Sequence, residues 1–188
     1  MDFFKSRHKA SHSYEEMLKT NLTDMDYFKL RVAYTNSNYY DPYGSGNEIR
    51  ELSNLYEEGK YQEIIKKASD LIITKFVNID FHIIVFSAAK RLNDEELLSF
   101  HGSIANNLMD SILNSGDGKT PENAYIVIST DEEYALLDRL NLKMKTQSLI
   151  KVDERNYDLL QVVDEEGNQT EIYFNIDLPY KWLDSKMK

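Results

Sequence analysis

The chain has 188 residues and a formal net charge of −10, with 41% hydrophobic and 12% aromatic residues. It is long enough for one large domain or two small ones around a packed core, and its few Gly and Pro residues argue against disorder. No basic face that could displace counterions from phosphate is visible, so we expect no nucleic-acid binding.

Cysteine is absent, which excludes disulfides, thiolate zinc sites and cysteine nucleophiles. No apolar run reaches the length of a signal peptide or a membrane span. We therefore expect a cytoplasmic protein without a membrane span, or an exported one if a leader was removed. The only basic cluster (Lys5, Arg7 and Lys9) falls in an N-terminal arm, residues 1–12, that is expected to be flexible.

Residues 13–115 have the apolar spacing of helices. The capping box Ser13-Tyr-Glu-Glu16 opens one short helix, and a second is expected to start within Thr23–Asp26. Four longer helices follow the 3.6-residue period: Glu48–Glu58, Lys60–Phe76, Ile79–Leu92, and one that a capping box at Asn93–Glu96 opens and that continues to Leu113. Short connections predict antiparallel hairpins, and Tyr56–Tyr61 resembles a tetratricopeptide-type turn, although the rest of that repeat is missing.

Residues 116–188 have strand patterns. Four strands and one helix are expected in the order Ala124–Ser129, a helix capped at Thr130–Glu133 and ending near Leu140, Thr146–Val152, Tyr157–Val163 and Thr170–Ile176. Gly167 suits the hairpin loop at 164–168, and a tail from Pro179 is expected to dock through Trp182. The fold class is therefore α+β: helical hairpins packed on a small, mostly antiparallel sheet with one helix, as one compact unit.

Thr35–Asn47 is a long connection rich in Tyr, Asn, Ser and Gly. Four tyrosines lie in it or beside it: Tyr34, Tyr39, Tyr40 and Tyr43. This composition is typical of adaptable recognition surfaces, because the rings supply contact area and the hydroxyls supply hydrogen bonds. The alternative is that the tyrosines only pack the loop onto the helices.

Gly118-Lys119-Thr120 does not fit a phosphate loop, because Leu113 stands where the first Gly is needed and a helix precedes it. The segment is either a polar turn or a groove beside Gly116–Lys119 in which Asp117, Lys119 and backbone N–H groups contact an anion or a partner.

His82 and His101 lie on consecutive helices at about the same height of an antiparallel hairpin, so they can face each other. They are either a metal or catalytic pair or core histidines bonded to backbone or Tyr groups. No third ligand is evident, so we assign no metal and no cofactor. Paired acids such as Glu132 and Glu133 are interpreted as solvated or capping residues of a first helical turn.

Several segments together resemble a bacterial family, the domain-of-unknown-function family 4919. They are Tyr27-x-x-Leu30-Arg31-x-Ala33-Tyr34-Thr35-x-Ser37-x-x-Tyr40-x-Pro42-Tyr43, the run Ser115–Tyr125, Glu132-Glu-Tyr134 and Ile172-Tyr-Phe-Asn175. The resemblance covers about Ser13 to Asp177. It implies no activity, because the family has none assigned, and many of its members look like exported proteins.

Two hypotheses of function follow. The first is a non-catalytic protein that binds a protein or a small ligand through five residues: Tyr39, Tyr40, Tyr43, Asp117 and Lys119. The alternative is a hydrolase-type enzyme in which His82, His101 and Asp117 converge in one pocket.

Overall fold

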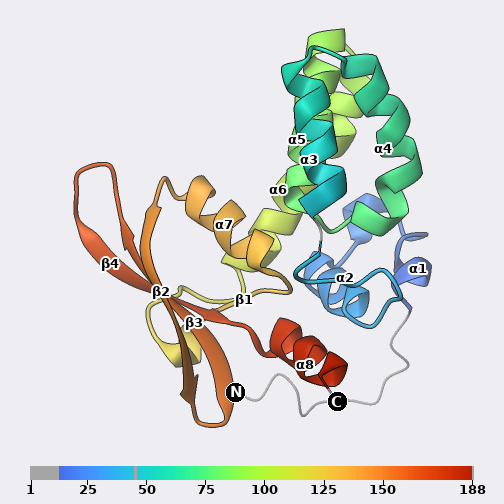
Figure 1. The fold of residues 1–188 in the computed structure, drawn as a ribbon. Coiled ribbons are helices and arrows are strands. Elements are labelled where there is room, and N and C mark those ends of the chain that lie inside the picture. Colours follow the sequence, from blue (N-terminus) through green and yellow to red (C-terminus); the bar gives the residue numbers. More distant parts are fainter. Residues whose placement is uncertain (1–12, 45, 188) are drawn as a thin grey trace.

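The computed structural model describes residues 13–44 and 46–187, so the arm expected at 1–12 lies outside the described residues. Helices fill the first part of the chain, and a four-stranded sheet with further helices fills the second (Figure 1). The α+β fold class is thereby confirmed.

Helices precede the sheet in this order: α1 (Tyr14–Met17), α2 (Tyr27–Tyr34), α3 (Gly46–Glu57), α4 (Tyr61–Lys75), α5 (Ile79–Leu92) and α6 (Glu95–Leu113). The second part contains β1 (Tyr125–Ile126), α7 (Thr130–Arg139), β2 (Lys143–Val152), β3 (Arg155–Val163), β4 (Gln169–Asn175) and α8 (Asp177–Lys186). Short 3₁₀ turns occupy Leu22–Asp24 and Pro121–Asn123. The expected C-terminal tail is therefore a second helix of the sheet part.

Side-chain caps mark where α1, α2, α5 and α6 begin. The Ser13 hydroxyl accepts the Glu16 N–H and the Glu16 carboxylate accepts the Ser13 N–H, as a capping box requires. The predicted box at Asn93 is wrong by one residue. Asp94 caps α6 by accepting the Leu97 N–H at 3.0 Å, whereas Asn93 ends α5 in the left-handed conformation with φ 55°.

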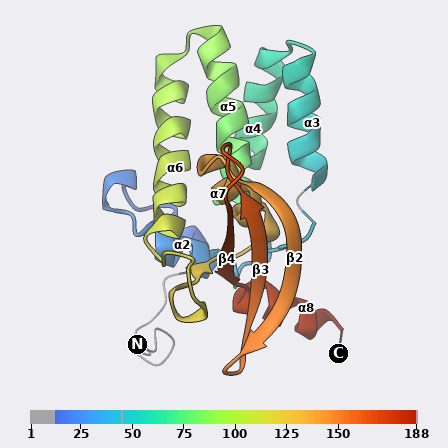
Figure 2. The ribbon, with the colours of Figure 1, turned by 90° about the vertical axis from the view of Figure 1, so that its left-hand side faces the viewer.

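Helices α3 to α6 stand side by side above the sheet (Figure 2). Helix α5 contacts α3, α4 and α6, and it also reaches α7 of the sheet part. Apolar side chains between α3, α4 and α5 form one buried cluster: Leu52, Leu55, Ile64, Ala68, Phe81, Val85 and Ala88. The helical period read from the sequence is the spacing that buries these residues.

The strand order of the sheet is β1-β4-β3-β2. β1 pairs with β4 in parallel, and the other two pairings are antiparallel, so the sheet is mostly antiparallel as predicted. β1 is shorter than the expected Ala124–Ser129 strand. Strand β2 forms an edge of the sheet and is exposed along nearly its whole length, with Lys143, Lys145 and Lys151 among its exposed residues.

A second, larger core is shared by both parts of the chain. Leu30 of α2 and Leu108 of α6 belong to the same buried cluster as Leu136 of α7, Leu160 of β3 and Phe174 of β4. All five are fully buried. Burial of each such side chain contributes about 1.5–3 kcal/mol, so this core holds the sheet against α2 and α6.

Candidate functional site

The tyrosine-rich connection after α2, here called the tyrosine loop (residues 35–44), is tied down at two points. The Tyr34 hydroxyl lies 3.0 Å from the carbonyl oxygen of Thr74 at the end of α4. The Tyr40 hydroxyl donates to the carbonyl oxygen of Ile128 at 2.6 Å, and the Tyr40 side chain is buried. These bonds fix the loop between the helices and the segment that follows β1.

A cavity of about 290 Å³ lies beneath the tyrosine loop. Its walls come from the loop, the start of α3, the α4–α5 junction and the segment between β1 and α7. The rings of Tyr34, Tyr39 and Tyr40 line one side, and Asn78 and Ser129 are among the polar residues that line the rest. We call this space the loop cavity.

The structure divides the predicted tyrosines by role. Tyr39 lines the loop cavity and is 39% exposed, so its ring is accessible. Tyr40 also lines the cavity but serves mainly as a buried anchor. Tyr43 is exposed and lies outside the cavity lining, with its ring 6.1 Å from that of Trp182 on α8. Of the alternatives that the sequence left open, packing thus describes Tyr40, whereas the rings of Tyr39 and Tyr43 remain accessible to solvent.

The charged groups of the loop cavity are mostly acidic. Asp41, Glu48 and Asp131 line it together with Lys75, whose Nζ lies 3.5 Å from an Oε of Glu48. The Asn78 amide donates to Asp131 at 3.4 Å. The lining therefore has more negative than positive charge.

A much smaller space beside it shares Asn78, Ser129 and Asp131 with the loop cavity and adds Asp80. Burial, together with the neighbouring charges of Asp131 and Asp138, raises the pKa of Asp80 to about 6. The negative potential of the cavity thus continues into the start of α5.

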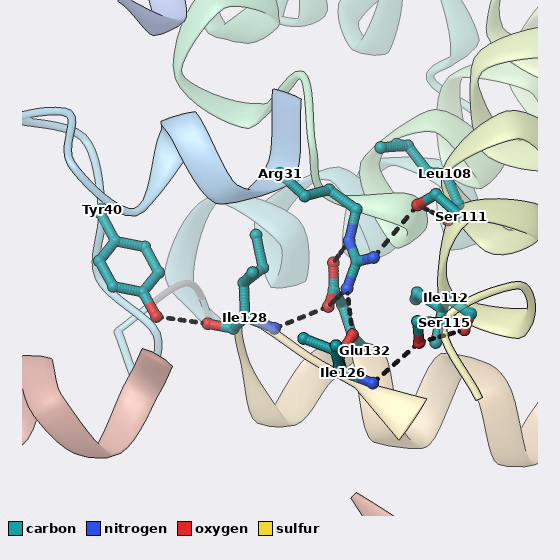
Figure 3. A network of polar contacts seen from close by, with 9 residues as sticks. All are labelled: Arg31, Tyr40, Leu108, Ser111, Ile112, Ser115, Ile126, Ile128 and Glu132. Atoms are coloured by element: carbon teal, nitrogen blue, oxygen red, sulfur yellow. Dashed lines mark hydrogen bonds and ion pairs between the residues drawn. The ribbon is translucent and has the colours of Figure 1, made fainter. Parts of the chain in front are cut away.

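Next to Ile128, which lines the loop cavity, lies an ion pair that sequence reasoning missed (Figure 3). The Arg31 guanidinium binds both carboxylate oxygens of Glu132, at 2.7 and 2.5 Å, and both residues are almost fully buried. Arg31 also donates to the Ile126 carbonyl at 2.7 Å and to the Ser111 hydroxyl at 3.2 Å. Glu132 accepts the Ile128 N–H at 2.8 Å. The pair therefore fixes the Ile128 segment, to which Tyr40 is anchored.

The interpretation of Glu132 and Glu133 as solvated or capping residues is wrong. Their exposed fractions are 3% and 1%, because the first turn of α7 faces the interior. The sequence offered one signal for the ion pair. Arg31 lies four residues after Tyr27 and three before Tyr34, on the inner face of α2, where a charge needs a partner.

Glu133 and Asp158 form a second buried acidic contact, between α7 and β3. Burial, together with the charge of Asp158, raises the pKa of Glu133 to about 9. The Gln147 amide donates to Asp158 at 2.8 Å, whereas one oxygen of Glu133 has no hydrogen-bond partner among the described residues. Glu133 is therefore protonated at neutral pH.

The two predicted histidines do meet. His82 Nδ1 and His101 Nδ1 lie 2.9 Å apart, and His82 Nε2 lies 2.8 Å from the Phe76 carbonyl. A carbonyl only accepts, so Nε2 of His82 carries a proton, and His101 Nδ1 must then donate to the bare Nδ1 of His82. Burial lowers the pKa of both rings, to about 4 for His101. The pair is a neutral hydrogen bond between α5 and α6.

Asp117 does not join the histidines. His101 lies in the second turn of α6, whereas Asp117 follows the end of that helix at Leu113 and is exposed. The intervening helix alone separates them by roughly 18 Å. The convergence of His82, His101 and Asp117 in one pocket is therefore wrong. Among residues 13–44 and 46–187, no three His, Cys, Asp or Glu side chains are arranged to hold a metal ion.

The segment Gly116–Lys119 is a turn whose polar groups bind one another. The Asp117 and Gly118 N–H groups both donate to the Asn123 carbonyl at 2.9 Å, and the Lys119 N–H donates to the Asp117 carboxylate at 3.0 Å. Gly118 has φ +69°, and a Cβ there would lie 2.5 Å from the Tyr125 ring. The N–H groups that an anion would need are thus occupied, and neither Asp117 nor Lys119 lines the loop cavity.

A second hollow, of about 460 Å³, lies beside α2 and α6, and its lining includes Ser111 and Ser115. Both hydroxyls already form hydrogen bonds within the protein: Ser111 accepts from Arg31, and Ser115 accepts the Ile126 N–H at 2.9 Å. The loop cavity, with its accessible ring and converging charges, is the stronger candidate.

Comparison with known proteins identifies a family. The model of a family described as "Domain of unknown function (DUF4919)" matches residues 9–188, which confirms the resemblance noted in the sequence. No curated protein and no solved structure matches the chain. The described helices include none with the length and apolar character that crossing a membrane requires.

Proposed function

The chain belongs to the family described as domain of unknown function DUF4919, and because that family has no assigned activity, we propose a function from the loop cavity itself. The protein is a non-catalytic binding protein that receives a small ligand beneath the tyrosine loop.

The observation that carries this proposal is a concave site with one accessible aromatic wall and several polar groups directed at one space. Its volume of about 290 Å³ is at the lower end of the range of small-molecule sites. Tyr39 supplies an exposed ring, and Asn78, Ser129 and Asp131 supply polar groups from two other elements. Few polar groups around an aromatic surface are typical of a ligand site.

The walls of the loop cavity are held in place without a ligand. Tyr34 and Tyr40 fix the loop to α4 and to Ile128, and the buried Arg31–Glu132 pair fixes Ile128 in turn. A site that is ordered before binding loses less conformational entropy when the ligand enters, so more of the contact energy appears as affinity.

The absence of a reacting centre in the cavity favours binding over catalysis. The histidine pair is buried between α5 and α6, and the described residues that line the cavity include no histidine. Ser129 and Thr74 therefore have no histidine in the described lining to act as the base that activates a hydroxyl nucleophile.

The test is a fragment screen by ligand-observed NMR on the wild-type chain, Tyr39→Ala and Tyr180→Ala. Tyr180 is a matched control, because it is 37% exposed on α8 and does not line the cavity. We expect hits that bind the wild type and Tyr180→Ala but are lost in Tyr39→Ala, with circular dichroism showing that all three fold. A screen in which every fragment binds Tyr39→Ala as well as the wild type would contradict the proposal, and so would a screen that gives no hits.

A further inference from the structure

We infer that the second hollow, beside α2 and α6, is a further binding site and that its ligand is a neutral compound rich in hydroxyl groups, a monosaccharide or a similar polyol. The hollow has a volume of about 460 Å³, which lies within the range of small-molecule sites. It shares no lining residue with the loop cavity, so this inference goes beyond the proposed function.

One face of α6 supplies most of the polar groups of the second hollow. They are Asn107, Asp110, Ser111 and Asn114. These residues recur at intervals of three or four along the helix and its C-cap, which places them on the same side. The first turn of α2, which packs on α6, adds the aromatic residues Tyr27 and Phe28. The hollow thus combines amide groups with aromatic surface.

Some polar groups of this lining are already bound within the protein. The Asp26 carboxylate accepts the Lys29 N–H at 3.0 Å and lies 2.8 Å from the Lys29 Nζ. The two serine hydroxyls also donate to carbonyl groups of α6. In contrast, the side chains of Asp110 and Asn114 form no hydrogen bond or ion pair with another described residue. These two side chains can therefore bind a ligand without breaking a bond of the fold.

The Tyr27 hydroxyl points to a ligand independently of the α6 face. The Tyr27 residue is 7% exposed, and its hydroxyl has no hydrogen-bond partner among the described residues. Burial raises the pKa of Tyr27, and the nearby Asn107 amide opposes this rise, so the amide lies close to the hydroxyl without bonding it. A buried hydroxyl without a partner is unfavourable, and a ligand hydroxyl that bonds both Tyr27 and Asn107 would remove this cost.

The kinds of group in the second hollow favour hydroxyl groups on the ligand. A hydroxyl both donates and accepts, and an Asn amide offers the same two functions, whereas the N–H groups of an ammonium ion would leave the amide donors without acceptors. The described lining contains Asp26 and Asp110 but no Lys, Arg or His, so an anionic ligand would meet repulsion. The Phe28 ring offers apolar surface to the carbon skeleton of a sugar.

The experiment is a titration by saturation-transfer-difference NMR, with the full chain and four neutral monosaccharides: glucose, galactose, mannose and N-acetylglucosamine. Two further probes test the chemical class. Glucuronate adds a negative charge, and tetrahydropyran keeps the ring but has no hydroxyl groups. We expect at least one neutral sugar to bind and neither of the other probes, because a site that bonds hydroxyl groups rejects analogues that lack them.

Asn107→Ala and Asn114→Ala should each weaken sugar binding by about five- to tenfold, which corresponds to the loss of one hydrogen bond. Asn106→Ala is the matched control, because Asn106 is also exposed on α6 but does not line the hollow. Tyr27→Phe should weaken binding as well. It should do so without lowering the melting temperature, because the hydroxyl that it removes has no partner in the folded protein.

Sugar binding that neither Asn107→Ala nor Asn114→Ala weakens would overturn the inference, and so would a panel in which no neutral sugar binds. Tetrahydropyran or glucuronate binding as tightly as the sugars would overturn the class of ligand. These outcomes are distinct from a failure of the proposed function, because Tyr39→Ala should leave sugar binding unchanged.

Discussion

Arg31 is buried to 99% and is nevertheless charged, because its donors reach acceptors on three other elements. They bind Glu132 of α7, the Ser111 hydroxyl of α6 and the Ile126 carbonyl of β1. A buried ion pair costs desolvation energy, and it becomes tolerable when hydrogen bonds satisfy the remaining groups. These bonds make Arg31 the residue that holds α2, α6, β1 and α7 in one arrangement.

Replacing Arg31 alone should therefore be more harmful than replacing the pair. Arg31→Met leaves the Glu132 carboxylate buried without a counter-charge, and we expect a loss of about 3–5 kcal/mol in the free energy of unfolding. The double variant Arg31→Met/Glu132→Gln should recover a clear part of that loss. Urea denaturation measures both, and equal losses in the single and double variants would show that the charges are not coupled.

Glu133 should make stability fall as the pH rises. Its pKa is about 9 in the folded chain against 4.5 ordinarily, so the folded state holds a proton that the unfolded state releases. The contribution of Glu133 to the free energy of unfolding is highest below pH 4.5, decreases as the pH rises above that value, and reaches its lower level above pH 9. Glu133→Gln should flatten this dependence in denaturation curves taken across that range.

The control for Glu133 is Glu171→Gln on β4, which removes a carboxyl at an exposed position. The Glu171→Gln variant should keep the wild-type decrease of stability with pH. A Glu133→Gln variant with an unchanged slope would mean that Glu133 is ionised in the folded protein.

At the scale of the elements, two adjacent polar residues define the junction of α5 and α6, because one ends the first helix and the next begins the second. Asn93 adopts φ 55°, which ends α5, and Asp94 accepts the Leu97 N–H, which begins α6. Asn tolerates the left-handed conformation better than most residues, and Asp is a strong N-cap. The order Asn-Asp thus suits a tight turn between two antiparallel helices.

Asp94→Ala should cost about 1 kcal/mol of stability, because the first turn of α6 loses its capping acceptor. Asn93→Gly should be neutral or slightly stabilising, because glycine adopts a positive φ without strain. The two variants can be compared by thermal denaturation. The opposite ranking would place the cap at Asn93, as the sequence pattern had suggested.

The tyrosine loop has its own measurable anchor. Tyr40→Phe keeps the ring but removes the hydroxyl that donates to Ile128, so we expect a loss of about 1 kcal/mol. Tyr43→Phe is the matched change at an exposed ring of the same loop and should cost almost nothing. If Tyr40→Phe also left the free energy of unfolding unchanged in urea denaturation, the loop would not depend on this bond for its position.

For the whole molecule, the periodic parts of the sequence predicted the fold well. The bounds Ile79–Leu92 match α5, and β4 lies within one residue of the expected strand Thr170–Ile176. Such patterns are local, because a helix or a half-buried strand repeats its apolar side at a fixed spacing. The position of His82 opposite His101 followed from the same geometry.

What the sequence could not supply were the partners of buried polar groups. Arg31 and Glu132 are 101 residues apart, and the chain offers 32 acidic residues as possible partners. The position of Glu132 and Glu133 in a first helical turn favoured a surface role, and only the packing of α7 shows otherwise. The composition of the tyrosine loop indicated a binding region, but two of the three acids that line the cavity, Glu48 and Asp131, come from α3 and α7.

The buried histidines and Glu133 together should give the molecule a stability maximum at mildly acidic pH. Burial lowers the pKa of His101 from 6.5 to about 4, so its contribution is complete above pH 6.5 and is lost as the pH falls toward 4. Glu133 acts in the opposite direction above 4.5. Denaturation curves should therefore peak between about pH 5 and 7, and His101→Gln should reduce the decrease on the acid side. A peak above pH 8 would contradict this account.

The edge strand β2 has a consequence for the protein in a crowded solution. The outer edge of a strand of this length presents unpaired backbone N–H and C=O groups, to which a strand of a second chain could hydrogen-bond. Repeated pairing of this kind leads to aggregation. Lys143, Lys145 and Lys151 place positive charge along that strand in a chain whose net charge is −10. Two copies that meet at their β2 edges would bring like charges together, so these lysines disfavour edge-to-edge pairing of the sheet.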